Sequence, residues 1–168
     1  LPLDLIPDSL SLRTSLSLQT SLSLSVSLQD LSFSLYMKSR CGDRAAFDQL
    51  QSLSRNGDVV CLGYLLLVLQ WSTIPLVIPS DKARAALMAR EVVADLQKKT
   101  RDGSFDDCGA LTHHEQAILG CLFCDGIGVQ KNELLAVRLM TFAANQGHAQ
   151  AQDNLGLCYD NGTGVSQD

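Results

Sequence analysis

Two cysteines and two histidines lie close enough in the sequence to suggest a metal site. Cys121 and Cys124 form a Cys-x-x-Cys motif, and His113 and His114 precede it. Thiolates and imidazoles are the ligands that zinc prefers. On a helix, Cys121 and Cys124 would lie on adjacent turns of one face, whereas the two neighbouring histidines would point in different directions. Because a second Cys-x-x-Cys motif is missing, the spacing favours buried thiols, and we predict no metal ligands and no cofactor.

The cysteines as a whole favour reduced, buried thiols. The six cysteines are spread over the chain at Cys41, Cys61, Cys108, Cys121, Cys124 and Cys158. A chain of this length can build its own core without disulfides, and free cysteine packs as a small hydrophobic residue. A redox pair or a metal site at Cys121 and Cys124 is the alternative.

No other motif in the sequence resembles a catalytic site. Cysteines, serines, histidines and aspartates are present, but no motif places a nucleophile, a base and an orienting group together. The Gly-x-Gly segments lack the lysine and hydroxyl residues of a phosphate-binding loop. Asp106 and Asp107 fit a solvated connector better than a catalytic pair. Tyr64 and Trp71 are large enough to anchor a partner, although packing in the core is the commoner role. We therefore predict that the protein is not an enzyme.

The composition excludes one class of partner. The chain has 168 residues and a formal net charge of −5, with 46% hydrophobic, 18% charged and 5% aromatic residues. Nucleic-acid-binding modules need clustered lysine and arginine to neutralise phosphates, and no such cluster is present. We therefore expect a protein or peptide partner and no nucleic acid. The length fits one domain, or one small domain with a tail.

Residues 1–36 differ from the rest of the chain. Leucine alternates with serine in the repeated hexapeptides SLSLRT, SLSLQT and SLSLSV. Alternation of this kind is a strand pattern, but no turn residues interrupt it and no partner strand is evident. We predict a low-complexity tail that is disordered; an aggregation-prone β segment is the alternative.

The next segments predict helices. Ala46, Phe47 and Leu50 recur at helical spacing, and this helix ends at Asn56-Gly57. No charged residue lies between positions 58 and 81, so a membrane span near 59–79 must be considered. Polar residues near its middle and two prolines favour a buried helix that ends near Trp71 and is followed by a loop. An amphipathic helix then begins near residue 81, and a polar connector follows it.

A repeat with a period of 36 residues begins at the next helix. Thr112 and Glu115 form a capping-box pattern at its start. The segment AILGCLFCDGIGVQKN aligns with DNLGLCYDNGTGVSQD, so that Leu119-Gly120 matches Leu155-Gly156. A fixed period in this range indicates stacked supersecondary units. Glycine inside a helix is costly, which suggests that a neighbouring helix packs close to Gly120 and Gly156.

These residues resemble the Sel1-like repeats, which are relatives of the tetratricopeptide repeat. The matching structural positions are Leu119, Gly120, Gly126, Gly128, Val129, Ala136, Ala143, Ala144, Gly147, Ala149, Ala151, Leu155, Gly156, Tyr159, Gly162, Gly164 and Val165, with Asp168 after them. The resemblance covers residues 117–168. It implies an α-solenoid that acts as an adaptor in multiprotein assemblies.

The resemblance weakens upstream of residue 111. Residues 43–110 are interpreted as a lone helix followed by one degenerate repeat, in which either Leu62-Gly63 or Leu65-Leu66 takes the place of the Leu-Gly pair. Residues 111–168 contain one repeat and the first half of another. The chain begins without methionine and ends within a repeat, so we expect a fragment.

Together these patterns predict an all-α protein built from antiparallel helical hairpins, stacked as a short α-solenoid after the N-terminal tail. The function that fits this architecture is a non-catalytic scaffold or adaptor whose groove holds a peptide or protein partner. The alternatives are a membrane-tethered adaptor with its span near 59–79 and a cysteine-based metal or redox protein.

Overall fold

The computed structural model describes residues 28–71, 81–106 and 108–165. A helix covers residues 28–40, and a short 3₁₀ helix, η1 (Cys108–Ala110), precedes α5. The remaining helices are α2 (Arg44–Ser54), α3 (Val59–Trp71), α4 (Lys82–Gln97), α5 (His113–Asp125), α6 (Glu133–Asn145) and α7 (Ala149–Asn161). The described segments contain no strand, so the all-α prediction is confirmed.

Most helices begin at a residue whose side chain accepts a backbone N–H. Asp43, Asp81 and Asn132 cap α2, α4 and α6 in this way. Such caps satisfy amide groups that have no partner within the helix. The predicted capping box of α5 is confirmed, because Thr112 and Glu115 accept from each other's backbone N–H.

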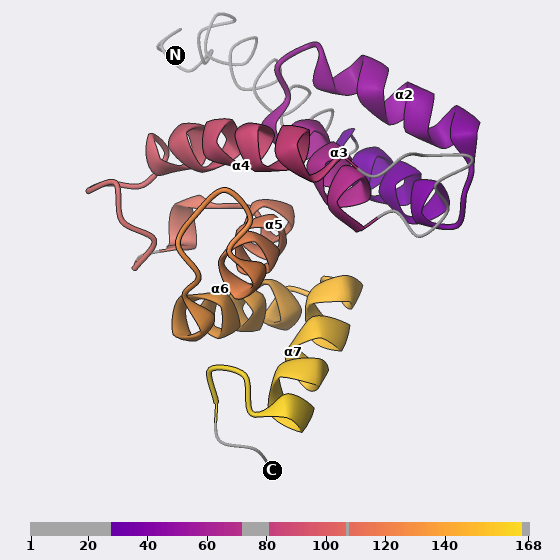
Figure 1. The fold of residues 1–168 in the computed structure, drawn as a ribbon. Helices are drawn as coiled ribbons and strands as arrows, with labels where there is room; N and C mark the ends of the chain where they lie inside the picture. The colour runs from indigo at the N-terminus through magenta and orange to yellow at the C-terminus, as the bar shows by residue number, and fades with distance from the viewer. Residues whose placement is uncertain (1–27, 72–80, 107, 166–168) are drawn as a thin grey trace, which may run out of the picture.

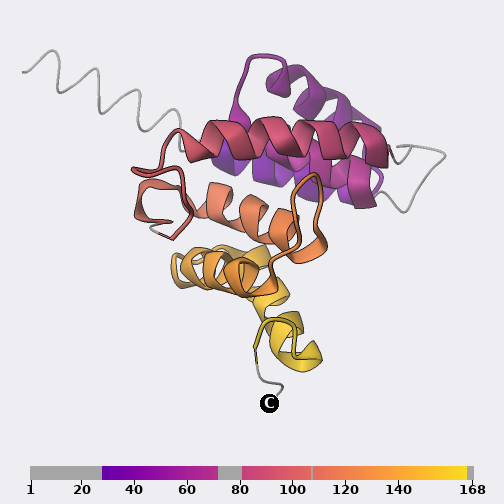
Figure 2. The same ribbon diagram turned by 60° about the vertical axis from the view of Figure 1, so that its left-hand side comes forward.

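The helices pack as hairpins that follow one another through the molecule. In Figures 1 and 2, α3 and α4 lie side by side, α5 and α6 form the next pair, and α7 lies beyond α6. The main core runs through these layers and includes Leu65, Leu96, Leu119 and Leu139. Each hairpin buries its apolar face against its neighbours, as repeat proteins do.

The repeated glycine inside the helices has a different role in the two copies. A Cβ atom at Gly120 would lie 2.7 Å from Cγ of Met140 on α6. Close packing of helices therefore explains glycine at this position. A Cβ atom at Gly156 would meet nothing within 4 Å, so the expected close contact at Gly156 is wrong for the described residues. No helix in the described part of the chain covers α7 as α6 covers α5.

Each Gly-x-Gly-Val turn contacts the helix that comes before the one it follows. Gly128 and Gly164 have φ angles of +68° and +67°, a backbone conformation that glycine adopts without strain. A Cβ atom at Gly128 would lie 2.4 Å from the Ala86 carbonyl oxygen of α4, and one at Gly164 would lie 2.5 Å from the Glu133 carbonyl oxygen of α6. The turn after α5 thus packs on α4 as the turn after α7 packs on α6.

The degenerate repeat at 43–110 stays a prediction, and the caps of the helices give a count of where its Leu-Gly pair would fall. Asp58 accepts the backbone N–H of Cys61, which places Asp58 at the start of α3. Position 66 follows position 58 by eight residues (66 − 58), as Gly120 follows Thr112 and Gly156 follows His148. By this count Leu65-Leu66, and not Leu62-Gly63, corresponds to the pair.

Part of the predicted disordered tail is helical. Residues 28–36 belong to the helix at 28–40, whereas residues 1–27 lie outside the described residues. Leu35 and Tyr36 are buried. Ser32 and Ser39 are buried too, and their hydroxyls donate to the carbonyls four residues earlier, at 2.7 Å. These bonds allow a serine-rich helix to enter the core without unpaired hydroxyls.

The apolar segment from position 59 forms the buried helix α3, which ends at Trp71 as predicted. The predicted loop at residues 72–80 lies outside the described residues. Among the helices that the structure describes, none is sufficiently long and apolar to traverse a bilayer. The residues of α3 contact α2, α4 and α5 instead.

The two helix glycines provide a matched test of the packing. Gly120→Leu should lower the free energy of unfolding by roughly 1–3 kcal/mol, because the side chain enters space held by Met140. Gly156→Leu should raise it by up to about 1 kcal/mol, because leucine favours the helix and meets no obstacle. Urea denaturation followed by circular dichroism measures both. Equal midpoints for the two variants would contradict this account.

Candidate functional site

A hollow lies between α5 and α7, and we call it the α5–α7 cavity. It has a volume of about 380 Å³. Its walls come from the helix at 28–40, the end of α3, helices α5, α6 and α7, and the turns after α5 and α7. The lining residues are Arg40, Trp71, Cys121, Cys124, Asp125, Lys131, Met140, Gln150, Asn154, Leu157, Cys158, Asn161 and Thr163.

One face of α7 supplies much of this lining. Gln150, Asn154, Leu157 and Asn161 recur every three or four residues, so they form a stripe along the helix. Leu157 is 57% exposed. The stripe combines three amides, which can both donate and accept hydrogen bonds, with an apolar side chain.

Charged groups lie at the edges of the cavity. Arg40 and Lys131 are basic, and Asp125 is acidic. Burial raises the pKa of the Asp125 carboxyl above its usual value, while Lys131 opposes this shift. Lys131 also forms an ion pair of 2.6 Å with Glu133. The cavity is therefore mixed in charge and has no metal-like acidic cluster among its described residues.

The cysteines of the predicted Cys-x-x-Cys motif line the cavity but do not form a ligand cluster with the histidines. Cys121 is buried, and burial raises the pKa of its thiol to about 12. Burial also raises the pKa of Cys124 to about 11. A thiol with a raised pKa is protonated at neutral pH and is a poor nucleophile and ligand. All six cysteines are free thiols in the structure.

Three histidines and two tyrosines meet beside the cavity, and we call them the His–Tyr cluster: Tyr36, Tyr64, His113, His114 and His148. The hydroxyl of Tyr64 lies 2.6 Å from Nδ1 of His114 and 3.0 Å from Nε2 of His148. Tyr36 stacks on Tyr64 with ring centroids 5.0 Å apart. The cluster joins the helix at 28–40 to α3, α5 and the start of α7.

The hydrogen bonds assign the protons in this cluster. Nδ1 of His148 accepts the backbone N–H of Ala151 at 3.2 Å, so the ring proton of neutral His148 is on Nε2, which donates to Tyr64. The Tyr64 hydroxyl then donates to Nδ1 of His114. Nε2 of His114 donates to the carboxylate of Asp30 at 3.3 Å. Each bond in this chain has one donor and one acceptor.

Two of the histidines, His114 and His148, are held in their neutral form. Burial, and to a lesser extent the neighbouring His114 and His113, lowers the pKa of His148 to about 4. Burial also lowers the pKa of His114, whereas Asp30 opposes the shift. Burial raises the pKa of the Tyr64 hydroxyl. Desolvation favours the uncharged form of each of these groups, so Tyr64, His114 and His148 form a neutral hydrogen-bonded network at pH 7.

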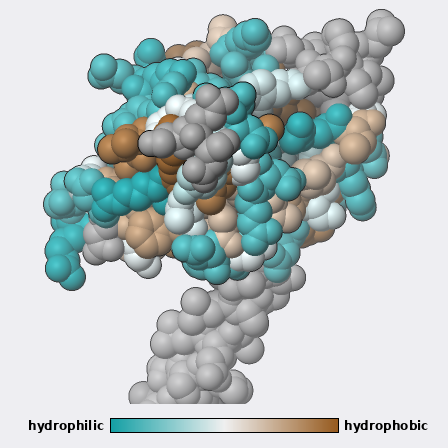
Figure 3. Space-filling view, turned by 90° about the horizontal axis from the view of Figure 1, so that it is seen from below, coloured by the Kyte–Doolittle hydropathy of each residue, from teal (hydrophilic) through white to brown (hydrophobic). Residues whose placement is uncertain are grey.

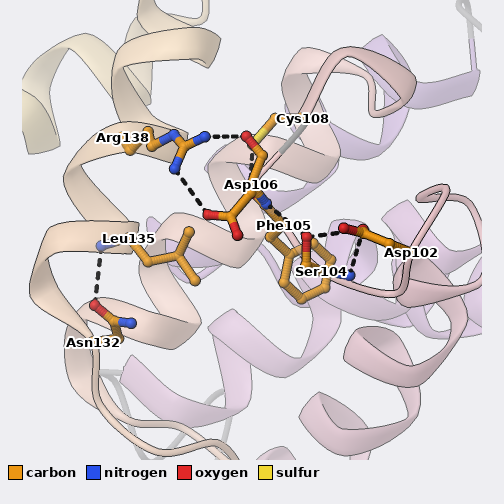
Figure 4. A network of polar contacts seen from close by, with 8 residues as sticks. All are labelled: Asp102, Ser104, Phe105, Asp106, Cys108, Asn132, Leu135 and Arg138. Carbon is orange, nitrogen blue, oxygen red and sulfur yellow. Dashed lines mark hydrogen bonds and ion pairs between the residues drawn. The ribbon is translucent and has the colours of Figure 1, made fainter.

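A second hollow lies between the connector after α4 and the first half of α6, and its lining includes Phe105, Leu134 and Leu135. Asp102 accepts from the backbone and hydroxyl of Ser104, which shapes the connector (Figure 4). Arg138 of α6 donates to the Asp106 carboxylate at 3.0 Å and to the Asp106 carbonyl. Asp106 is thus an exposed structural link, as predicted for a connector, and Asp107 lies outside the described residues.

The repeat positions fall into three environments. Buried positions are Leu119, Gly120, Ala136, Ala143 and Ala151, and half-buried positions are Ala144, Leu155, Val129 and Val165. Gly126 and Gly162 cap α5 and α7 in the left-handed conformation, and Gly147 follows α6 at a φ of +86°. Ala149, Gly156 and Tyr159 are exposed on α7. Asp168 lies outside the described residues.

Sequence reasoning missed the His–Tyr cluster. Tyr64 and His148 are separated by 84 positions, and no motif links them. The only local signal was the histidine before the helix Ala149–Asn161, since a residue at this place caps the helix. Trp71 lines the cavity, as a partner anchor would, whereas Tyr64 is fully buried.

The fold and the cavity define an all-α protein of stacked helical hairpins. The family model of the Sel1 repeat matches residues 116–148 and 149–168, and this part of the chain is similar to Sel1 repeats. Such repeats are typically protein-interaction repeats and are generally non-catalytic. The matched residues do not include 43–110. No curated protein matches the sequence.

The burial of the thiols predicts their reactivity. In native protein, iodoacetamide should modify the exposed Cys41 first, and Cys61 and Cys121 should react at least about tenfold more slowly, because both are buried and have a raised pKa. Peptide mass spectrometry over time measures the rates. In guanidinium chloride the difference should disappear, and fast native labelling of Cys121 would contradict the structure.

Removal of one hydroxyl tests the His–Tyr cluster. Tyr64→Phe keeps the ring but leaves His114 and His148 without their shared partner, so it should lower the free energy of unfolding by about 1–3 kcal/mol. Tyr159→Phe, at an exposed tyrosine, is the control and should change nothing. Chemical denaturation at pH 7 compares them, and an unaltered Tyr64→Phe midpoint would refute the network.

Proposed function

We propose that this protein is a non-catalytic scaffold that holds a short peptide segment of a partner protein in the α5–α7 cavity. The observation that carries the proposal is the stripe on α7, which places amides and an exposed leucine along one wall of an open hollow. The similarity to Sel1 repeats at 116–168 supports it, since repeats of this type typically bind proteins.

The lining fits a peptide better than a compact polar ligand. Gln150, Asn154 and Asn161 are spaced along α7, so their amides can pair with successive backbone groups of a peptide. Trp71, Met140 and Leu157 provide apolar surface for a side chain of that peptide. Hydrogen bonds to a backbone supply affinity, and pockets for side chains supply specificity.

The surface around the cavity is consistent with this use. Figure 3 shows hydrophobic surface interrupted by hydrophilic side chains on the side of the molecule where the C-terminal helices lie. Leu157 and Tyr159 of α7 are both large hydrophobic residues that remain exposed. A contact surface with apolar centres and polar borders is typical of protein interfaces. The repeats hold this surface in place before binding, which lowers the entropic cost of association.

A peptide library displayed on phage, selected against the full chain, tests the proposal. Selected peptides should bind with a dissociation constant that rises at least about tenfold, or ~1.4 kcal/mol, in Leu157→Asp and Asn154→Ala. Fluorescence polarisation with labelled peptides measures the affinity. Leu157 is exposed and Asn154 is half-buried, and circular dichroism verifies that both variants fold.

The matched control is Glu91→Ala, which alters an exposed residue on α4, away from the cavity lining. Its affinity for the selected peptides should equal that of the unmodified protein. If selection yields no binder, or if binders are insensitive to Leu157→Asp, the cavity is not the binding site and the proposal fails.

A further inference from the structure

We propose that His113, His114 and His148 form a binding site for a divalent transition-metal ion of the kind that prefers imidazole ligands, with zinc as the representative. Each of these histidines offers one ring nitrogen, and the three nitrogens lie within 4.8 Å of one another. This site is independent of the proposed peptide cavity and uses none of the cysteines.

The unused nitrogen of His113 is the first argument. Nδ1 of His113 is buried and has no hydrogen-bond partner among the described residues. A buried polar atom without a partner is rare in folded proteins and calls for an explanation. The His113 ring lies beside the other two, with centroids 4.2 Å from His114 and 5.6 Å from His148. A metal ion shared by the three rings would satisfy this nitrogen.

The distances fit a site that closes by small side-chain movements. Zinc binds imidazole nitrogen at about 2.0–2.1 Å, so the nitrogens of a tetrahedral site are about 3.4 Å apart. The three nitrogens, at no more than 4.8 Å, must approach one another by up to about 1.4 Å, through rotation of the rings. Three histidines with an open fourth position form a recognised zinc geometry.

Tyr64 and Asp30 place oxygen atoms next to the histidine rings. The Tyr64 hydroxyl lies against one ring nitrogen of His114 and one of His148, so its oxygen is placed to approach a fourth position. The N-terminal dipoles of α5 and α7 oppose a cation here, but the Asp30 carboxylate, 3.3 Å from Nε2 of His114, supplies negative charge.

Binding would exchange existing hydrogen bonds for metal bonds. Nδ1 of His148 accepts from Ala151, so coordination through Nε2 moves the ring proton to Nδ1 and ends that cap. The Tyr64 hydroxyl likewise releases the ring nitrogens that it contacts. The loss of these hydrogen bonds opposes metal binding, and the metal bonds must exceed it; structural zinc sites bind strongly enough to do so. A bound ion would fix the start of α5 to the start of α7 and so set the angle between successive repeats.

The test uses the full chain, reduced and stripped of metal with a chelator, and zinc chloride as the probe. Isothermal titration calorimetry should show one ion per chain, and free zinc at about a hundred times the dissociation constant should raise Tm by roughly 5–10 °C. Cobalt bound in place of zinc should give a spectrum without a thiolate charge-transfer band.

Two histidine variants and one cysteine variant separate the possible ligands. His113→Gln removes a ligand whose Nδ1 forms no hydrogen bond in the metal-free fold, and His148→Asn retains a residue that caps helices well. Both should fold and should lose at least about a hundredfold in zinc affinity. Cys124→Ser should bind zinc as the unmodified chain does.

Other results overturn the proposal. The proposal is wrong if the unmodified chain binds no zinc and its Tm does not change when zinc is added. Zinc affinity that survives in His148→Asn but is lost in Cys124→Ser would assign the ion to the thiols and not to the histidines.

Discussion

The stacking of the helices depends on how closely neighbouring backbones approach one another. Glycine allows the closest approach because it has no Cβ atom. At Gly120 the absence of a Cβ atom lets α5 approach Met140 of α6. At Gly128 and Gly164 it lets the turn after α5 contact a carbonyl group of α4, and the turn after α7 contact a carbonyl group of α6. These contacts place each hairpin against the one before it, and the cavity and the His–Tyr cluster lie where the stacked helices meet.

The tightly packed part of the molecule combines apolar contacts with buried polar side chains, of which Glu115 and Gln116 have hydrogen-bond partners. Glu115 is almost completely buried, yet it accepts from the backbone of Thr112 and forms an ion pair with Lys99. The buried Gln116 donates to two carbonyls of the connector before α5. Burial of such groups is tolerated because each finds a partner, and their partners tie the connector to the repeat that follows.

The sequence was sufficient to predict the helices and the repeat, but not the environment of each repeat position. Glycine and leucine at matching positions revealed the period of 36 residues, because helical packing requires these residue types locally. Gly156 shows the limit of that inference: it occupies the same position as Gly120, but in the described structure no helix covers it. A residue type that recurs at a fixed period indicates a repeated fold. The contacts of each copy depend on which helix packs against it.

The other misses have equally specific causes. The helix at 28–40 was hidden by its serine-leucine composition, since the hydroxyl bonds that make buried serine acceptable within a helix leave no trace in the sequence. The His–Tyr cluster was hidden because its members come from four elements, and only the tertiary fold brings them together. Local motifs such as Cys121-x-x-Cys124 were visible, but burial made their thiols unreactive structural groups.

The helix at 28–40 changes how this stack should respond to stress. In an ordinary solenoid each unit touches only adjacent units, so it can open from one end without disturbing the other. Here Ser32 meets Cys61 of α3, Asp30 meets His114 of α5, and Tyr36 meets Gln150 of α7. The helix at 28–40 therefore contacts several layers of the stack. Unfolding of α7 is thus coupled to dissociation of this helix from the other layers.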